Sequence, residues 1–295
     1  MGNNHNHDHS TENVRLAFFL NVGFTIIEII GGLYTNSLAI LSDALHDLGD
    51  SLSLGMAWYL QKLSSKGRTR TFSYGYRRFS LLGAILNAVI LVTGSVFVLS
   101  KAIPQLFHPE ETNAPGMMAL AVLGILVNGA AVLRLKKGKS MNEKVVSLHL
   151  LEDVLGWVAV LIGSIIMYFY DAPFIDPLLS LGISLFVLYN AVKNLYKSIK
   201  IVLQAVPDEV NIEGLQDDLK EIQEISSIHD CHVWSLDGNY TVMTIHVVLD
   251  RDYKLSEQYE LKGRICSELK PRDIDHLTVE FEIEGQHCAQ NENQN

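Results

Sequence analysis

Residues 38–53, LAILSDALHDLGDSLS, carry His46 and Asp50 four positions apart inside an otherwise apolar segment. The same spacing returns in residues 145–168, VVSLHLLEDVLGWVAVLIGSIIMY, at His149 and Asp153. On an α-helix, residues i and i+4 lie on one face, one turn apart. Each segment therefore presents one imidazole and one carboxylate along a single stripe of a helix.

Both stretches belong to a series of six apolar segments, each close to the roughly 20 residues that cross a bilayer. We predict membrane spans over residues 14–34, 38–60, 80–102, 117–135, 145–168 and 173–196. The second and fifth have lower hydropathy because they contain the His/Asp pairs, but their length and helical periodicity still favour spans. The sequence thus predicts an α-helical membrane protein with a six-helix transmembrane bundle.

The Lys and Arg residues of the connecting loops are concentrated on one side. Between spans two and three lie Lys62, Lys66, Arg68, Arg70, Arg77 and Arg78, and between spans four and five lie Lys136, Lys137 and Lys139. The loops on the other side contain no Lys or Arg. Because positively charged loops stay in the cytoplasm, both termini are predicted to be cytoplasmic. The short loops favour a bacterial inner membrane, with an organellar membrane as the alternative.

From about residue 205 the composition changes to that of a charged, soluble domain. Helical periodicity at 211–225 and 255–269, and strand-like stretches at 228–234, 240–249 and 276–283, give the order αββαβ. This order predicts a small α+β domain that has an antiparallel sheet with helices on one face. The predicted organisation is a flexible His-containing tail (1–13), the six-span transmembrane domain (14–204), the cytoplasmic domain (205–285) and a flexible tail (286–295).

The composition argues against two classes of protein. A net charge of −10 does not suit a nucleic-acid binder, which is normally basic. The three cysteines, Cys231, Cys266 and Cys288, show no regular spacing, so we expect no disulfide framework. A reducing compartment fits this cysteine usage better.

The two His/Asp stripes are predicted to form one metal site. Two such helices side by side would supply four ligands of the kind that bind Zn²⁺ tetrahedrally: His46, Asp50, His149 and Asp153. A single polar residue in a span more often bonds to a neighbouring helix, the interpretation we give to Asn21, Asn87 and Asn128. Two identical pairs favour metal coordination, and ionisable groups at membrane depth mark ion pathways. The sequence predicts transport of a divalent metal and leaves Zn²⁺, Cd²⁺ and Co²⁺ open.

The ligand types also predict exchange with protons. Zn²⁺ binds neutral imidazole and ionised carboxylate, so loading the site displaces protons. Histidine titrates near physiological pH, and its protonation on the more acidic side would release the metal. We therefore predict a metal/proton antiporter that needs no catalytic cofactor. The proton stoichiometry and the resting conformation stay open.

Several other acidic residues lie near this site in the sequence. Asp43 lies three residues before His46 and is interpreted as a supporting or access residue. Asp47 and Glu152 lie off the His/Asp stripes, and they either line a path from the cytoplasm or occupy a hydrated cavity. Glu28 and Asp176 are structural or lie near an outer vestibule.

Two other classes of protein fit the sequence less well. An intramembrane metalloenzyme would need an open metal position for water, but the four predicted ligands leave none, and no His-Glu-x-x-His motif occurs. A metal sensor anchored by its spans would not need buried His/Asp pairs in two separate helices. The sequence therefore favours a transporter over an enzyme.

Five motifs in order are similar to those of the cation diffusion facilitator family, and the resemblance covers nearly the whole chain. They are NSLAILSDALHDLGD (36–50), YGYRR (74–78), SLHLLED (147–153), DP (176–177) and IHDCHVW (228–234). The resemblance is to bacterial exporters of zinc, cadmium and cobalt. It implies a homodimer in the lipid bilayer that exports Zn²⁺ from the cytoplasm in exchange for protons, with a cytoplasmic αββαβ domain.

The resemblance also implies a second metal site in the cytoplasmic domain, where Zn²⁺ would be structural or regulatory. His229, His246 and Glu282 match the family's ligand positions there. Glu280 and Tyr259 stand where relatives carry His, so a binuclear centre is not expected unchanged. No metal is expected in the His-free loop 71–78. The remaining candidates have no assigned role: His232, Cys288 and the N-terminal His5, His7 and His9.

Overall fold

The computed structural model describes residues 5–64, 67–135 and 141–285, with the side chains of 5–17, 20, 54, 57–58, 60–62, 64, 134–135 and 141–149 excepted. The chain divides into two compact units. One contains most of the long helices, and the other contains the C-terminal domain, the end of the sixth helix from residue 196, and residues 67–82, which include the start of the third helix.

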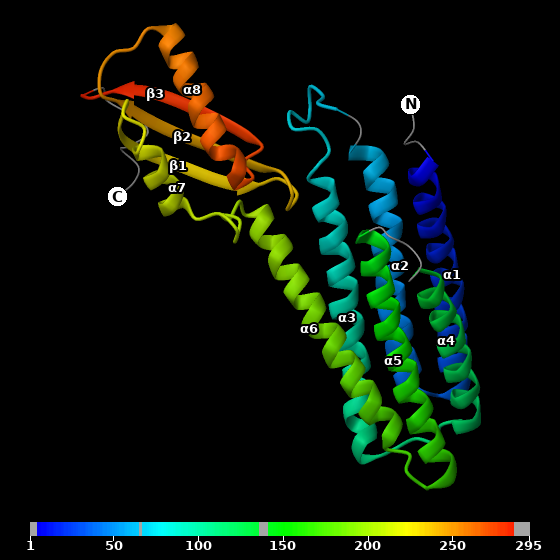
Figure 1. Ribbon diagram of the computed structural model, residues 1–295. Helices are drawn as coiled ribbons and strands as arrows, with labels where there is room; N and C mark the ends of the chain where they lie inside the picture. Colours follow the sequence, from blue (N-terminus) through cyan, green and yellow to red (C-terminus); the bar gives the residue numbers. More distant parts are fainter. Residues whose placement is uncertain (1–4, 65–66, 136–140, 286–295) are drawn as a thin grey trace. The chain divides into compact units, whose positions relative to one another are not determined.

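Six long helices precede the C-terminal domain (Figure 1). They are α1 (His5–Thr35), α2 (Leu38–Ser64), α3 (Phe79–Phe107), α4 (Ala114–Leu135), α5 (Met141–Phe169) and α6 (Ile175–Val202). All six are longer than the predicted spans, and five contain them completely, whereas α6 begins at Ile175, two residues after the predicted start at 173. The difference is largest at α1, which begins at His5, inside the segment predicted as a flexible tail.

Four helical segments in the described part of the chain are long and apolar enough to cross a membrane by length and composition. They are Phe79–Phe107, Ala114–Leu133, Leu150–Phe169 and Ile175–Val202. Large apolar side chains such as Phe97, Leu126 and Phe186 are exposed on these helices, as lipid-facing residues would be. The spans predicted in α1 and α2 stay predictions.

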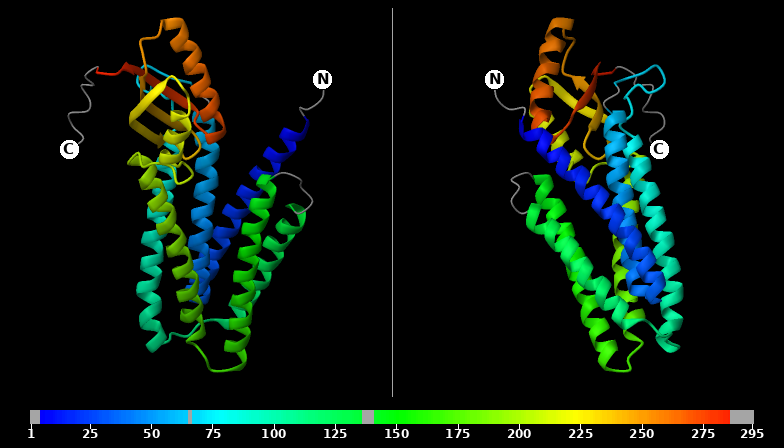
Figure 2. Two further views of the ribbon diagram at one scale, coloured as in Figure 1. Left: turned by 60° about the vertical axis from the view of Figure 1, so that its left-hand side comes forward. Right: turned by 90° about the vertical axis from the view of Figure 1, so that its right-hand side faces the viewer.

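A buried apolar cluster joins α1, α2, α4 and α5. It contains Phe24, Ile40, Met117, Trp157 and Val160. Helices α4 and α5 run side by side (Figure 2), and they approach closely where Gly124 meets the ring of Trp157. A Cβ atom on Gly124 would lie 2.4 Å from that ring, so no larger residue fits there. This packing fixes the position of α5 in the bundle.

Asp176, at the start of α6, caps α2 instead of its own helix. Its carboxylate accepts hydrogen bonds from Ser37 Oγ at 2.5 Å, Leu38 N at 2.8 Å and Ala39 N at 3.3 Å. The first N–H groups of a helix have no partner within the helix, and Asp176 satisfies two of them. Of the two roles considered for Asp176, these contacts favour the structural one.

The C-terminal domain has the predicted order αββαβ. Its elements are α7 (Ile212–Lys220), β1 (Ile225–Ser235), β2 (Thr241–Leu249), α8 (Leu255–Leu269) and β3 (His276–Ile283), with a short 3₁₀ turn at Lys270–Arg272. The predicted first helix, 211–225, was too long, since the chain turns after Lys220 and enters β1 at Ile225.

The prediction of an antiparallel sheet is wrong for β3. Strands β1 and β2 are antiparallel, but β3 lies parallel to β2. The reason is the connection: α8 crosses over between the two strands and returns the chain to the same end of the sheet. Leucines of α7 and α8 pack with Met243, Ile245 and Val247 in one core, so the helices cover one face, as predicted. The alternate residues, including His246, point to the opposite face.

Candidate metal sites

The predicted transport site is partly described by the structure. On α2, His46 Nε2 lies 3.7 Å from Asp50 Oδ2, and both side chains are about one-fifth exposed, at 19% and 24%. This distance is longer than a hydrogen bond but within the range of an ion pair, so the two groups face each other on one side of the helix. On α5, Asp153 is buried, with 5% of its surface exposed. The side chain of His149 lies outside the described part of the structure.

The acidic face of α2 is directed towards α5. Asp43 interacts electrostatically with Asp153 of α5 and with Asp50 of its own helix. Its Oδ1 atom also lies 3.7 Å from the place where a Cβ atom of Gly156 would stand. Carboxylates of both helices therefore lie within interaction range, although the sequence alone could not establish that α2 and α5 are neighbours.

The other acidic candidates differ in burial. Glu28 and Asp47 are buried, whereas Glu152, next to Asp153, is exposed. Asn21 of α1 donates to Ser51 Oγ at 3.0 Å and to the Asp47 carbonyl at 3.3 Å. Asp47 thus lies on the side of α2 that packs against α1.

The prediction that membrane asparagines join helices is confirmed for two of the three. Asn21 bonds to α2, and Asn87 Nδ2 donates to Ser53 Oγ at 2.7 Å, between α3 and α2. Asn128 is buried, but its Nδ2 atom has no hydrogen-bond partner among the described residues. Hydrogen bonding by Nδ2 to a neighbouring helix is therefore not found for this residue.

The three predicted ligands of the C-terminal domain come together on the sheet face opposite its helices. His229, His246 and Glu282 each offer a ligand atom within 4.8 Å of the others. Glu282 Oε1 lies 2.7 Å from His246 Nδ1, and Glu282 Oε2 lies 3.2 Å from His229 Nε2. His246 and Glu282 are buried, at 6% and 8% exposure. Two imidazoles and a carboxylate are a donor set that suits Zn²⁺.

Asp230 is a neighbour of this cluster that the sequence analysis missed. Its Oδ2 atom lies 3.4 Å from His246 Nε2, at the same distance as Glu280 Oε2. Asp230 has a φ of 48° and sits where the register of β1 with β2 shifts. Strand alternation would point Asp230 and His229 to opposite faces, and this irregularity brings both towards His246. The adjacency of Asp230 to His229 was the only signal in the sequence.

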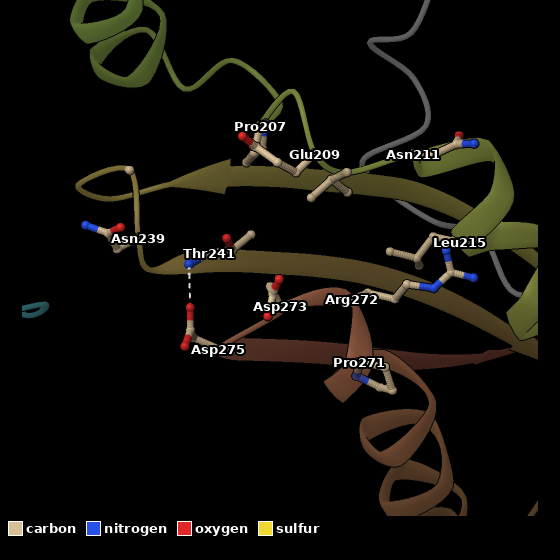
Figure 3. A pocket seen from close by; sticks show the side chains of 12 residues that line it. Pro207, Glu209, Asn211, Leu215, Asn239, Thr241, Pro271, Arg272, Asp273 and Asp275 are labelled. Carbon is tan, nitrogen blue, oxygen red and sulfur yellow. Dashed lines mark hydrogen bonds between the residues drawn. The ribbon is translucent and has the colours of Figure 1, made fainter. Parts of the chain in front are cut away.

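A separate pocket in the C-terminal domain shows no comparable ligand set (Figure 3). Pro207, Asn211, Thr241, Arg272 and Asp275 are among its lining residues. Asp275 Oδ2 accepts a hydrogen bond from Thr241 N at 2.8 Å, so this carboxylate holds the start of β2 in place.

Long apolar helices with buried acidic residues, followed by a domain with a histidine–carboxylate cluster, define an integral membrane protein that handles metal cations. Residues 14–203 match the family model for the cation efflux transmembrane domain. Residues 207–284 match the model for the cation efflux protein cytoplasmic domain. The chain belongs to this family, the cation diffusion facilitators, whose members are transporters and not enzymes.

Curated relatives match over almost their whole length. The "Cadmium, cobalt and zinc/H(+)-K(+) antiporter" of Bacillus subtilis is 31% identical, over 97% of this chain and 93% of the relative. The "Metal cation efflux system protein CzcD" of Cupriavidus metallidurans is 32% identical, over 96% and 91%. The "Zinc transporter ZitB" of Escherichia coli is 31% identical, over 99% and 97%. The chain is thus similar to bacterial exporters of zinc, cadmium and cobalt.

Proposed function

We propose that this chain is a Zn²⁺/proton antiporter that exports the metal from the cytoplasm, with Cd²⁺ and Co²⁺ as further substrates. The metal is bound by His46, Asp50, His149 and Asp153 and released by alternating access. The observation that carries the proposal is the interaction of carboxylates from α2 and α5 around one buried region, where Asp43 interacts with both Asp50 and Asp153. The names of the relatives, which include zinc and protons, support the choice of ions.

The chemistry follows from the four ligands. Asp50 and Asp153 together balance the charge of a divalent metal, which lowers the cost of placing it in a low-dielectric region. His46 and His149 add neutral nitrogen donors that suit Zn²⁺. When the site opens to the more acidic side, protons compete for the same atoms and displace the metal. The protonated site then returns and carries protons inward.

The topology and assembly are part of the same proposal. The Lys- and Arg-rich loops, 61–79 and 136–144, place both termini in the cytoplasm of a bacterial cell, with the transport domain in the inner membrane. The match to the cytoplasmic-domain model supports a homodimer. Within that domain, His229, His246 and Glu282 hold a structural or regulatory Zn²⁺.

The test is Zn²⁺ uptake into proteoliposomes with an imposed pH gradient. The chains compared are the wild type, Asp50→Asn, Asp153→Asn and Asp171→Asn, the last serving as a control because Asp171 is an exposed carboxylate in the connection between α5 and α6. We expect gradient-driven uptake in the wild type and the control, and a fall of at least about 100-fold in both Asp variants, since each removes a direct ligand. Uptake that survives both Asp substitutions would show that the transport site is wrong. A wild-type chain that moves no zinc would favour the sensor function.

A further inference from the structure

Glu28 of α1 is a fully buried carboxylate that the transport site does not use. Its exposure is 0%, no hydrogen bond that meets both distance and angle limits reaches either oxygen from a described residue, and its strongest charged neighbour is another carboxyl group, that of Asp47. Asp176 is just as buried, but three hydrogen bonds from Ser37, Leu38 and Ala39 satisfy it. A structural carboxylate in this bundle is therefore saturated with donors, whereas Glu28 is not.

The carboxylate of Glu28 is directed towards α2. Two turns before it on α1, Asn21 bonds to Ser51 and to the Asp47 carbonyl. Helices α1 and α2 are joined by a short turn and run in opposite directions (Figure 1), so Glu28 lies opposite the part of α2, before Ser51, that carries Asp43 and Asp47, and it interacts with both. The helices stay close beyond this point, because a Cβ atom on Gly32 would lie 2.8 Å from the Leu41 side chain.

The strongest electrostatic neighbours of Glu28 are all acidic. They are Asp47, Asp43 and Asp153. Several carboxylates that share a buried region repel each other, and burial raises the cost of each charge. A divalent cation between two of them removes both penalties at once, and α5 offers no side chain at Gly156 to occupy the space beside Asp43.

We propose that Glu28 and Asp43 form a second cation site, which binds the transported divalent metal next to His46, Asp50, His149 and Asp153. This inference rests on the proposed function. Asp43 precedes His46 by three residues, or about 4.5 Å along the helix, towards the end of α2 predicted to face outwards. The second site is therefore an intermediate binding site on the path by which the metal leaves the protein. Its oxygen ligands hold Zn²⁺ less tightly than a site with two imidazoles, so the metal passes on.

The binding test uses the full chain in lipid nanodiscs and equilibrium dialysis against radioactive Zn²⁺. A background with His246→Gln, Asp50→Asn and Asp153→Asn removes metal from the C-terminal domain and from the transport site. We expect this background to retain Zn²⁺, and Glu28→Gln or Asp43→Asn to weaken the retained binding by about 10- to 100-fold. Asp171→Asn, which changes an exposed carboxylate in the connection between α5 and α6, leaves it unchanged.

The second measurement is transport by the otherwise wild-type chain. Glu28→Gln, which keeps the size of the side chain, is expected to lower the rate of Zn²⁺ uptake while the transport site still binds metal. The proposal is overturned if the background binds no Zn²⁺, or if Glu28→Gln changes neither binding nor uptake. Normal uptake by the Asp50→Asn chain would instead refute the proposed transport site, so the two failures are distinguishable.

Discussion

Glu224 and Arg264 show how a single contact makes the stability of the C-terminal domain depend on pH. Arg264 donates a hydrogen bond to the Glu224 carboxylate, and this bond holds the pKa of Glu224 below its usual value. Because the folded-state pKa is lower than the unfolded one, the pair stabilises the domain at neutral pH. The stabilisation is lost as the pH falls through the folded-state pKa.

Arg264→Ala is therefore expected to lower the free energy of unfolding of this domain at pH 7 by about 0.2–1 kcal/mol, the range for exposed pairs. The difference from the wild type disappears in acid. Hydrogen exchange of the β-sheet amides in the full chain measures both values. A difference that persists unchanged in acid would contradict the ionic origin.

The two described cysteines differ in reactivity for a physical reason. Burial raises the pKa of the Cys231 thiol, whereas Cys266 is exposed on α8. Thiolates react with alkylating reagents, and thiols do not. We expect iodoacetamide at mildly alkaline pH to modify Cys266 well before Cys231, as followed by peptide mass spectrometry. Equal rates would mean that Cys231 is accessible and ionised.

Sequence reasoning at the residue scale succeeded where spacing carries the information. His46 and Asp50 were predicted on one stripe of a helix, and the structure has them facing each other on α2. It failed for Asp230, since alternation along a strand gives no sign of the irregularity that turns this residue towards His246. For Glu28, the sequence of α1 does not reveal which helix lies opposite.

At the scale of elements, the cap that Asp176 provides for α2 can be tested directly. Asp176→Ala removes the acceptor of three hydrogen bonds and leaves the buried Ser37 hydroxyl and helix N–H groups without it. We expect a loss of about 1–2 kcal/mol in stability, seen as a lower midpoint of thermal unfolding in detergent. Asp171→Ala, at an exposed position before α6, is the matched control. Equal midpoints for the two variants would refute the capping role.

The loop between α2 and α3 contacts the C-terminal domain of its own unit through Arg77. The guanidinium lies 3.7 Å from Asp237 Oδ2 and 4.2 Å from the centre of the Tyr240 ring, at the turn between β1 and β2. Arg77→Ala is expected to speed hydrogen exchange at residues 237–240, because both contacts are lost. Arg78→Ala, the exposed neighbour, should leave exchange unchanged. The same rate in both variants would contradict the contact.

The boundaries of elements were predictable where strong periodicity meets clear breaks. The helix at 255–269 and the strand at 276–283 were predicted with the ends that the structure has. The direction of β3 was not, because alternation is the same in parallel and antiparallel strands. Only the length of the connection through α8 distinguishes them, because a parallel pair needs a long crossover whereas an antiparallel pair can be joined by a short turn.

At the scale of the whole molecule, metal removal should separate the two proposed binding regions. If His229, His246 and Glu282 hold Zn²⁺ as proposed, the bound ion stabilises the folded C-terminal domain by mass action. Adding a chelator is therefore expected to raise hydrogen exchange in β1, β2 and β3 of the full chain. In a His246→Ala variant the chelator should have no effect on these strands. A chelator effect that survives in the variant would place the stabilising metal elsewhere.

Alternating apolar segments and charged loops predict a boundary between a transmembrane domain and the C-terminal domain near residue 205. This boundary stays a prediction, and the structure groups residues 196–202, the end of α6, with the C-terminal domain. Which helices touch could not be predicted, because each segment is apolar on several sides. Close approaches such as Gly124 against Trp157 depend on shape in three dimensions.

The cluster of the C-terminal domain takes His229 from β1, His246 from β2 and Glu282 from β3, one residue from each strand. An ion held by all three would cross-link the three strands of the sheet. A pulling force applied at the first residues of the domain would act on the metal–ligand bonds before it could separate β1 from β2. With zinc bound, the domain would resist the force as one rigid unit. Without the ion, its strands would separate one after another.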